Sequence, residues 1–160
     1  MNGPGEMPAG EVVRIVDWLE SAGVIYQVNG GWGVDALVGR QTRPHRDLDI
    51  FLDAAREDDF LAWLFSRGCR MVEDWRPVRS EVVCHRGRVD VHPMMIDEAG
   101  DGCQKGLSGE TYVHAARDRV CGWIGGRPVI VASAARSREL RMGYPARDVD
   151  RHDLDQLDNM

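Results

Sequence analysis

The stretch from residue 30 to residue 53 constrains this chain more than any other. A glycine pair, Gly30-Gly31, leads into a short segment with apolar residues at helical spacing, which Gly39 ends. After a basic loop, Asp47-Leu48-Asp49 opens an apolar run. Side chains alternate along a strand, so we expect Asp47 and Asp49 on one face and Leu48 in the core. Two adjacent carboxylates are costly unless a cation lies between them.

These features together indicate a nucleotide site. Mg²⁺ is usually held by one or two carboxylates together with substrate phosphates. Gly30 and Gly31 allow the backbone to approach a polyphosphate closely, and the following helix directs free N–H groups to the same place. Asp-x-Asp on exposed strand ends and Gly-Gly in turns are common as purely structural features. Their combination in this order favours metal-assisted nucleotidyl transfer.

A second carboxylate strand follows. Residues 80–85 and 88–94 are separated by Arg86-Gly87, which is typical of a hairpin. In the second run Asp90 and His92 are predicted on one face. A carboxylate there would complete a metal cluster or deprotonate an incoming hydroxyl, and the sequence leaves open whether Asp90 or Glu81 is that base.

Elsewhere hydrophobic periodicity and turn residues predict an α/β (α+β) order of elements. We expect helices at 9–22, 54–67, 132–142 and 148–157, strands at 24–29, 69–74, 120–124 and 128–131, and an acidic, glycine-rich loop at 97–110. Ser133 or a neighbour is expected to cap the 132–142 helix. Arg136, Arg138 and Arg141 are predicted on its solvated face, where one of them could reach a triphosphate.

Composition narrows the function further. The 160 residues are 43% hydrophobic and 29% charged, as expected of one globular domain over 1–160 with a flexible segment at 1–8. The net charge of −6 disfavours nucleic-acid binding and suits a cationic acceptor. We find neither an apolar run of the ~20 residues that span a membrane nor a signal peptide, and therefore expect a cytoplasmic protein.

The cysteines show no metal-binding spacing. Cys69, Cys84, Cys103 and Cys121 lack any Cys-x-x-Cys pair. Without a secretory signal we expect reduced thiols, mostly buried.

The glycine pair, short helix and Asp-x-Asp resemble the polymerase-β-like nucleotidyltransferase superfamily. The segments 30–35, 39–41 and 45–50 look more closely like the antibiotic nucleotidyltransferases, in which Trp32 replaces the superfamily serine. Residues 75–81, with Trp75-x-Pro77-x-Arg79-x-Glu81, and Asp90-Val91-His92-Pro93 resemble the small lincosamide enzymes in particular. The resemblance is strongest at 29–53 and 75–93 and weak at 97–128.

This resemblance implies a mixed sheet flanked by helices and transfer of AMP from ATP, or another NTP, to an antibiotic hydroxyl. Asp47, Asp49 and Asp90 would be the catalytic residues and Mg²⁺ ligands. The other implied contacts are to phosphate, through Gly30, Gly31, Arg46 and Arg79, and to the acceptor, through Trp75, Glu81 and His92.

A lincosamide is the first expected acceptor and an aminoglycoside the second. Residues 75–110, or a partner subunit in a homodimer, would build its pocket, with Trp75, Met94 and Met95 as apolar candidates. Two other hypotheses remain: a small nucleotidyltransferase that modifies a protein, as in toxin–antitoxin modules, and a silent relative that only binds nucleotide. We expect no nucleic-acid or membrane partner, and a monomer or a homodimer.

Overall fold

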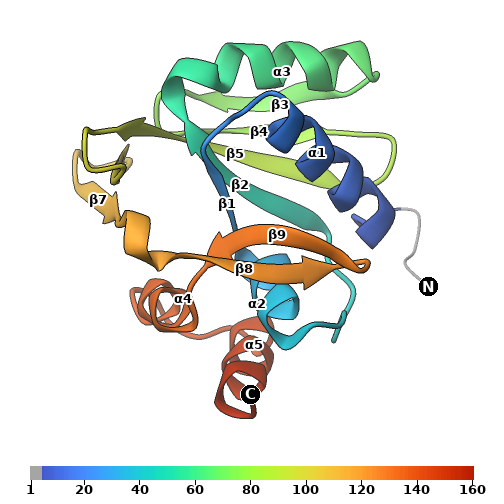
Figure 1. The fold of residues 1–160 in the computed structure, drawn as a ribbon, viewed down its shortest axis with the longest axis vertical. Coiled ribbons are helices and arrows are strands. Elements are labelled where there is room, and N and C mark those ends of the chain that lie inside the picture. Colours follow the sequence, from blue (N-terminus) through green and yellow to red (C-terminus); the bar gives the residue numbers. More distant parts are fainter. Residues whose placement is uncertain (1–4) are drawn as a thin grey trace.

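A computed structural model describes residues 5–160, and its centre is a mixed β-sheet (Figure 1). The strands follow the order β3-β4-β5-β2-β1-β9-β8. Their bounds are β1 Tyr26–Asn29, β2 Asp47–Asp53, β3 Arg70–Trp75, β4 Arg79–Val83, β5 Arg88–Ile96, β8 Arg119–Ile124 and β9 Arg127–Ala132. The β2–β5 and β1–β9 pairs are parallel, and the other neighbours along this order are antiparallel.

Helices gather in two groups. The helices are α1 Ala9–Ser21, α2 Gly30–Val38, α3 Glu57–Ser66, α4 Ala134–Arg141 and α5 Asp148–Asp158, with short 3₁₀ turns at Ala54–Arg56 and Ala116–Asp118. Figure 1 shows α1 and α3 on one side of the molecule and α2, α4 and α5 gathered at the other. Trp18 of α1 lies against Phe60 and Trp63 of α3, with ring centroids 5.6 and 5.4 Å apart.

The sheet separates an apolar face from a polar one. Leu48, Ile50, Val89 and Val91 are fully buried in the core with residues of α1 and α3. Asp47, Asp49, Asp90 and His92 alternate with them along β2 and β5 and are only partly buried. This confirms the predicted mixed sheet flanked by helices, and it leaves the polar face for the site.

The predicted loop at 97–110 is wrong in part. Gly102–Lys105 forms strand β6, which pairs with the end of β5 and with strand β7, Thr111–His114. The β6 sequence, Gly-Cys-Gln-Lys, has no apolar alternation. It forms a strand because its main-chain groups pair on both sides, with Met95 and Ile96 on one and with β7 on the other.

The cysteine prediction is also wrong. Cys69 and Cys84 form a disulfide, with their Cα atoms 4.3 Å apart. The antiparallel register of β3 and β4 pairs Arg70 with Val83, so the two cysteines are the next opposed residues. Cys103 and Cys121 are free and exposed rather than buried.

The predicted flexibility of residues 1–8 stays a prediction. Residues 1–4 lie outside the described part of the chain. Met7 is buried, and its backbone N–H donates to the His45 carbonyl at 2.7 Å. Within residues 5–160 we find no helix with the length and apolar character to cross a membrane.

Candidate active site

Three aspartates converge on the polar face of the sheet. The parallel register of β2 and β5 places Asp49 directly opposite Asp90, and Asp47 lies two residues earlier on β2, on the same face. One carboxylate oxygen from each lies within 4.8 Å of the others. We call Asp47, Asp49 and Asp90 the acidic floor.

The acidic floor carries crowded negative charge. Burial, followed by the charges of Asp49, Asp47 and Glu81, raises the pKa of Asp90 to about 8. Burial and the Asp49 charge also raise the pKa of Asp47. Burial opposes ionisation of Asp49 too, but the hydrogen bond and charge of His92 outweigh it and lower its pKa. A cluster of hard oxygen donors under mutual repulsion suits a divalent cation such as Mg²⁺.

The glycine pair lies directly against this cluster. A Cβ atom on Gly30, whose φ is +66°, would collide with the Asp49 carboxylate. A Cβ atom on Gly31 would collide with the Arg43 guanidinium and lie 2.6 Å from His45 Nδ1. Both positions therefore require glycine because other side chains occupy the space.

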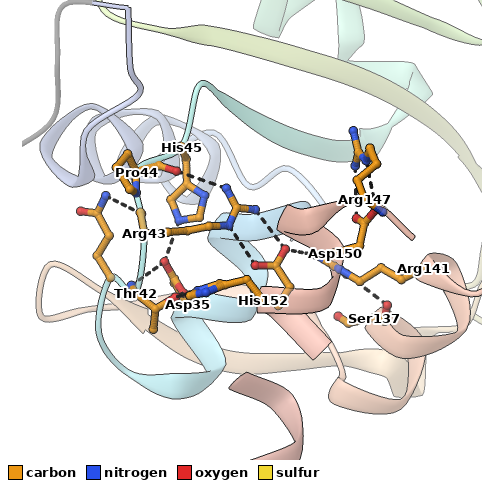
Figure 2. Close-up of polar contacts among 12 residues, drawn as sticks. Asp35, Thr42, Arg43, Pro44, His45, Ser137, Arg141, Arg147, Asp150 and His152 are labelled. Carbon is orange, nitrogen blue, oxygen red and sulfur yellow. Dashed lines mark hydrogen bonds and ion pairs between the residues drawn. The ribbon is translucent and has the colours of Figure 1, made fainter. Parts of the chain in front are cut away.

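A buried carboxylate anchors the basic loop to α2. Asp35 accepts hydrogen bonds from the Thr42 backbone N–H at 2.8 Å and from the Thr42 hydroxyl. His45 Nε2 lies 2.6 Å from the same carboxylate, and Thr42 Oγ1 lies 2.8 Å from His152 Nε2 on α5 (Figure 2). Burial opposes ionisation of Asp35, but these hydrogen bonds lower its pKa. The loop is thus held beside the glycine pair.

Three arginines of the site are each paired with an aspartate of α5. Arg43 donates to both carboxylate oxygens of Asp153 at 3.0 Å, and Arg141 donates to Asp153 at 3.0 Å and to the Ser137 carbonyl at 3.1 Å. Figure 2 shows Arg43 reaching in from the loop and Arg141 from α4. Arg147 pairs with Asp150 at 3.0 Å. We call Arg43, Arg141 and Arg147 the basic wall.

Asp47 and Asp49 of the acidic floor and the three arginines of the basic wall line one cavity of about 600 Å³, and Asp90 is not among the described lining residues. Apolar, aromatic and further polar or charged side chains complete its lining. The lining residues outside the floor and the wall are Asn29, Gly30, Gly31, Arg46, Phe51, His92, Leu140, Tyr144, Val149, Asp150 and Asp153. The cavity lining therefore combines cationic side chains with two carboxylates of a potential cation site.

The structure brings together some of the predicted site residues. Gly30, Gly31, Arg46 and His92 line the cavity with Asp47 and Asp49. Arg46 lies 3.6 Å from Asp47, with 69% of its side chain exposed. Glu81 faces Asp90 across the β4–β5 pair, but Arg88 holds it at 2.7 Å.

Other predicted residues lie outside this lining. The guanidinium of Arg79 stacks over the Trp75 ring at 4.7 Å and lies 3.8 Å from Glu73. Met94 is fully buried and Met95 is 69% exposed. Trp75, Arg79 and the two methionines are therefore absent from the cavity lining as the described residues form it.

The sequence interpretation considered Arg43 only as one basic residue of the 40–46 loop that could contact phosphate, and it gave Tyr144 and Arg147 no site role. Arg43 was visible as part of a basic loop, but nothing local indicated its pairing with α5. Arg141 was predicted on a solvated face, and that prediction is wrong because the side chain is 7% exposed and paired with Asp153.

Comparisons with known proteins agree with this geometry. The family profile described as aminoglycoside-2''-adenylyltransferase matches residues 11–157. A lincosamide resistance protein of Staphylococcus haemolyticus is 36% identical over 104 residues. These residues make up 64% of this chain and 65% of that protein, so the match spans less than two thirds of the relative's length.

Solved structures share the architecture. The lincomycin-bound crystal structure of the lincosamide antibiotic adenylyltransferase LnuA superposes with a TM-score of 0.87 at 29% identity, covering 96% of this chain and 98% of that one. ANT(2'')-Ia in complex with adenylyl-2''-tobramycin superposes with a TM-score of 0.66 at 20% identity, covering 93% and 88%. The second likeness shows the fold alone.

Proposed function

Because the chain belongs to the aminoglycoside-2''-adenylyltransferase family, we propose that it transfers AMP from ATP to a hydroxyl of a lincosamide antibiotic. The observation that carries the proposal is the acidic floor beside the glycine pair, with Asp47 and Asp49 lining one cavity together with the basic wall. A product of this kind confers resistance if the added nucleotide blocks drug binding to its target.

The nucleotide occupies the side of the cavity next to α2. Gly30 and Gly31 line the cavity at the start of that helix, where backbone N–H groups have no helical partner and can donate to phosphate oxygens. Arg46, whose side chain is 69% exposed, supplies charge toward the triphosphate, and an arginine fork binds phosphate bidentately. Arg79, which stacks on Trp75, lies outside the described cavity lining and is not assigned to the phosphate.

Asp47, Asp49 and Asp90 would hold Mg²⁺, whose chemistry is to neutralise charge on the pyrophosphate leaving group. Asp90 is the proposed base for the acceptor hydroxyl. Its main competitor, Glu81, is held by Arg88 at 2.7 Å. A base must reach the proton that it accepts, and Asp90 lies opposite Asp49, which lines the cavity.

The lincosamide acceptor is proposed ahead of an aminoglycoside. LnuA superposes more closely than ANT(2'')-Ia, with TM-scores of 0.87 and 0.66, and the match to LnuA extends over nearly both whole chains. Phe51, Leu140, Tyr144 and Val149 give the cavity apolar surface for a drug or a base. We propose further that the enzyme works in the cytoplasm, where ATP is available, as a monomer or a homodimer.

The test is a mass measurement. The protein is incubated with ATP and Mg²⁺ and with either lincomycin or tobramycin, and the drug is examined for one added AMP. We expect the adduct on lincomycin, its loss on chelation of Mg²⁺, and its loss in Asp90→Asn. Asp74→Asn is a matched control because Asp74 is an exposed carboxylate on β3 outside the cavity lining.

Two results would overturn parts of the proposal. An adduct on tobramycin alone would make the aminoglycoside the acceptor. ATP binding with no adduct on either drug would contradict the antibiotic proposal and favour a protein acceptor, which labelled ATP would then reveal on proteins of the host extract.

A further inference from the structure

Two polar side chains of the β6–β7 hairpin are linked through His92 to Asp49 of the acidic floor. His114, at the end of β7, is 1% exposed, and its Nε2 lies 2.9 Å from Oε1 of Gln104 on β6. The Gln104 amide nitrogen lies 3.5 Å from His92 Nδ1. His92 Nε2 in turn lies 3.3 Å from Asp49 Oδ1. The four residues form a continuous hydrogen-bonded chain, with Gln104 and His114 absent from the cavity lining as described.

The direction of each hydrogen bond follows from the Asp49 end. An ionised carboxylate only accepts, so His92 Nε2 must carry a proton. In a neutral imidazole the other nitrogen, Nδ1, then accepts, and Gln104 must present its NH₂ group to it. The Gln104 carbonyl is left facing His114, whose Nε2–H donates.

The reversed chain is disfavoured by His114 itself. Reversal would make His114 Nε2 an acceptor and put its proton on Nδ1, which is buried without a partner in the described residues. A buried N–H without an acceptor is costly. Burial lowers the pKa of His114 to about 4, which keeps this imidazole neutral near pH 7.

Phe51 holds both imidazoles in place. Its ring stacks on His92 with centroids 4.2 Å apart and planes 10° apart. It meets His114 edge-on at 4.8 Å and 68°. The rings therefore have little freedom to rotate out of the chain of hydrogen bonds, and His92 presents one fixed nitrogen to Asp49.

We infer that Gln104 and His114 are positioning residues that act through His92 to orient the Asp49 carboxylate for nucleotidyl transfer. The inference rests on the proposed function. Partners behind a metal-binding group commonly contribute 10–100-fold to metal affinity or activity, although they touch neither metal nor substrate. The hairpin thus serves the acidic floor from a segment outside the main strand order.

The test combines three variants with a double-mutant cycle. We expect Gln104→Leu to lower kcat about tenfold with little change in the KM of the drug. His114→Phe keeps the ring against Phe51 and removes the donor, and should lower kcat less. Cys103→Ser is the matched control, because Cys103 neighbours Gln104 but is exposed and outside the chain of hydrogen bonds.

The cycle separates positioning from folding. If Gln104 acts through His92, then Gln104→Leu costs nothing further in a His92→Ala background. An equal loss of kcat in both backgrounds, or an unchanged kcat in Gln104→Leu, would overturn the inference.

A ¹⁵N NMR measurement of the His92 ring nitrogens keeps this result apart from the proposed function. We expect a protonated Nε2 and an unprotonated Nδ1, and loss of this state in Gln104→Leu. If the wild type modifies no acceptor but this response is seen, the function fails and the hydrogen-bonded chain stands. If the wild type is active and the spectrum does not respond, the chain of hydrogen bonds fails alone.

Discussion

Asp47 and Asp49 of the acidic floor line one cavity with the basic wall, but the charges of the floor and of the wall are neutralised to different extents within the chain. In the floor, three carboxylates lie within 4.8 Å of one another, and burial and mutual repulsion raise the pKa of two of them. In the wall, Asp153 pairs with Arg43 and Arg141, and Asp150 pairs with Arg147. Charge that the chain does not neutralise is available to a ligand, whereas neutralised charge holds the structure together.

The largest expected effect is a loss of activity, without a loss of stability, when a carboxylate of the acidic floor is removed. Asp47→Asn should lower the rate of nucleotidyl transfer by about 10²–10³-fold, because it removes a preorganised charge from the site. It should leave the thermal midpoint of the metal-free protein unchanged or raised, since one repulsive carboxylate is gone. The checks are drug adenylylation and thermal unfolding, and a lower midpoint would contradict the contrast between floor and wall.

The same kind of change in the wall should act on stability. Asp153→Ala leaves Arg43 and Arg141 without their shared partner, and breaking a buried ion pair costs about 3–5 kcal/mol. Urea unfolding measures the loss. Asp153→Asn keeps two hydrogen-bond acceptor sites on the remaining oxygen and should cost less, whereas equal stability of Asp153→Ala and wild type would show that the wall is not structural.

The pH dependence should have opposite signs in the two regions. Between about pH 4 and 8, Asp90 binds a proton in the folded protein but not in the unfolded chain, so its contribution to stability falls as the pH rises. Arg147 lowers the pKa of Asp150 to about 2 against the opposing effect of burial, so that contribution is lost as the pH falls from about 4 to 2.

Mg²⁺ distinguishes these two contributions. By binding the ionised floor, it should raise the thermal midpoint more at pH 8 than at pH 5. Asp90→Asn should reduce the pH dependence of the thermal midpoint between about pH 4 and 8. It should leave unchanged the loss of stability between about pH 4 and 2, which comes from Asp150. The prediction would be contradicted if the thermal midpoint of the metal-free protein rose with pH above pH 5 and this rise were absent in Asp90→Asn.

The smallest effect belongs to the exposed part of the wall. Arg147 is 68% exposed although its partner Asp150 is buried. Arg147→Ala should therefore cost less than about 1 kcal/mol in urea unfolding. If Arg147→Ala lowered the free energy of unfolding as much as Asp153→Ala, exposure would not determine how much each ion pair of the basic wall contributes to stability.

Local sequence patterns predicted most of the main sheet and six of the sixteen described residues that line the cavity. Strand alternation is a property of neighbouring residues, so it predicted the shared face of Asp47 and Asp49 and that of Asp90 and His92. Helix and turn residues placed α1, α3 and the β4–β5 hairpin within a few residues of their observed bounds, and Ser133 was correctly identified as the cap of α4. The sequence also predicted Gly30 and Gly31 beside the site, and both lie close to side chains of the site.

What the sequence by itself determined is therefore which residues share a face and where elements begin and end. Only the tertiary structure decided that Asp49 lies opposite Asp90, that Asp153 brings Arg43 and Arg141 together, and that Gln104 reaches His92. The physical reason is range. Periodicity acts over a few residues, whereas these contacts join segments 12 to 110 residues apart, through strand register and helix packing that no local pattern encodes.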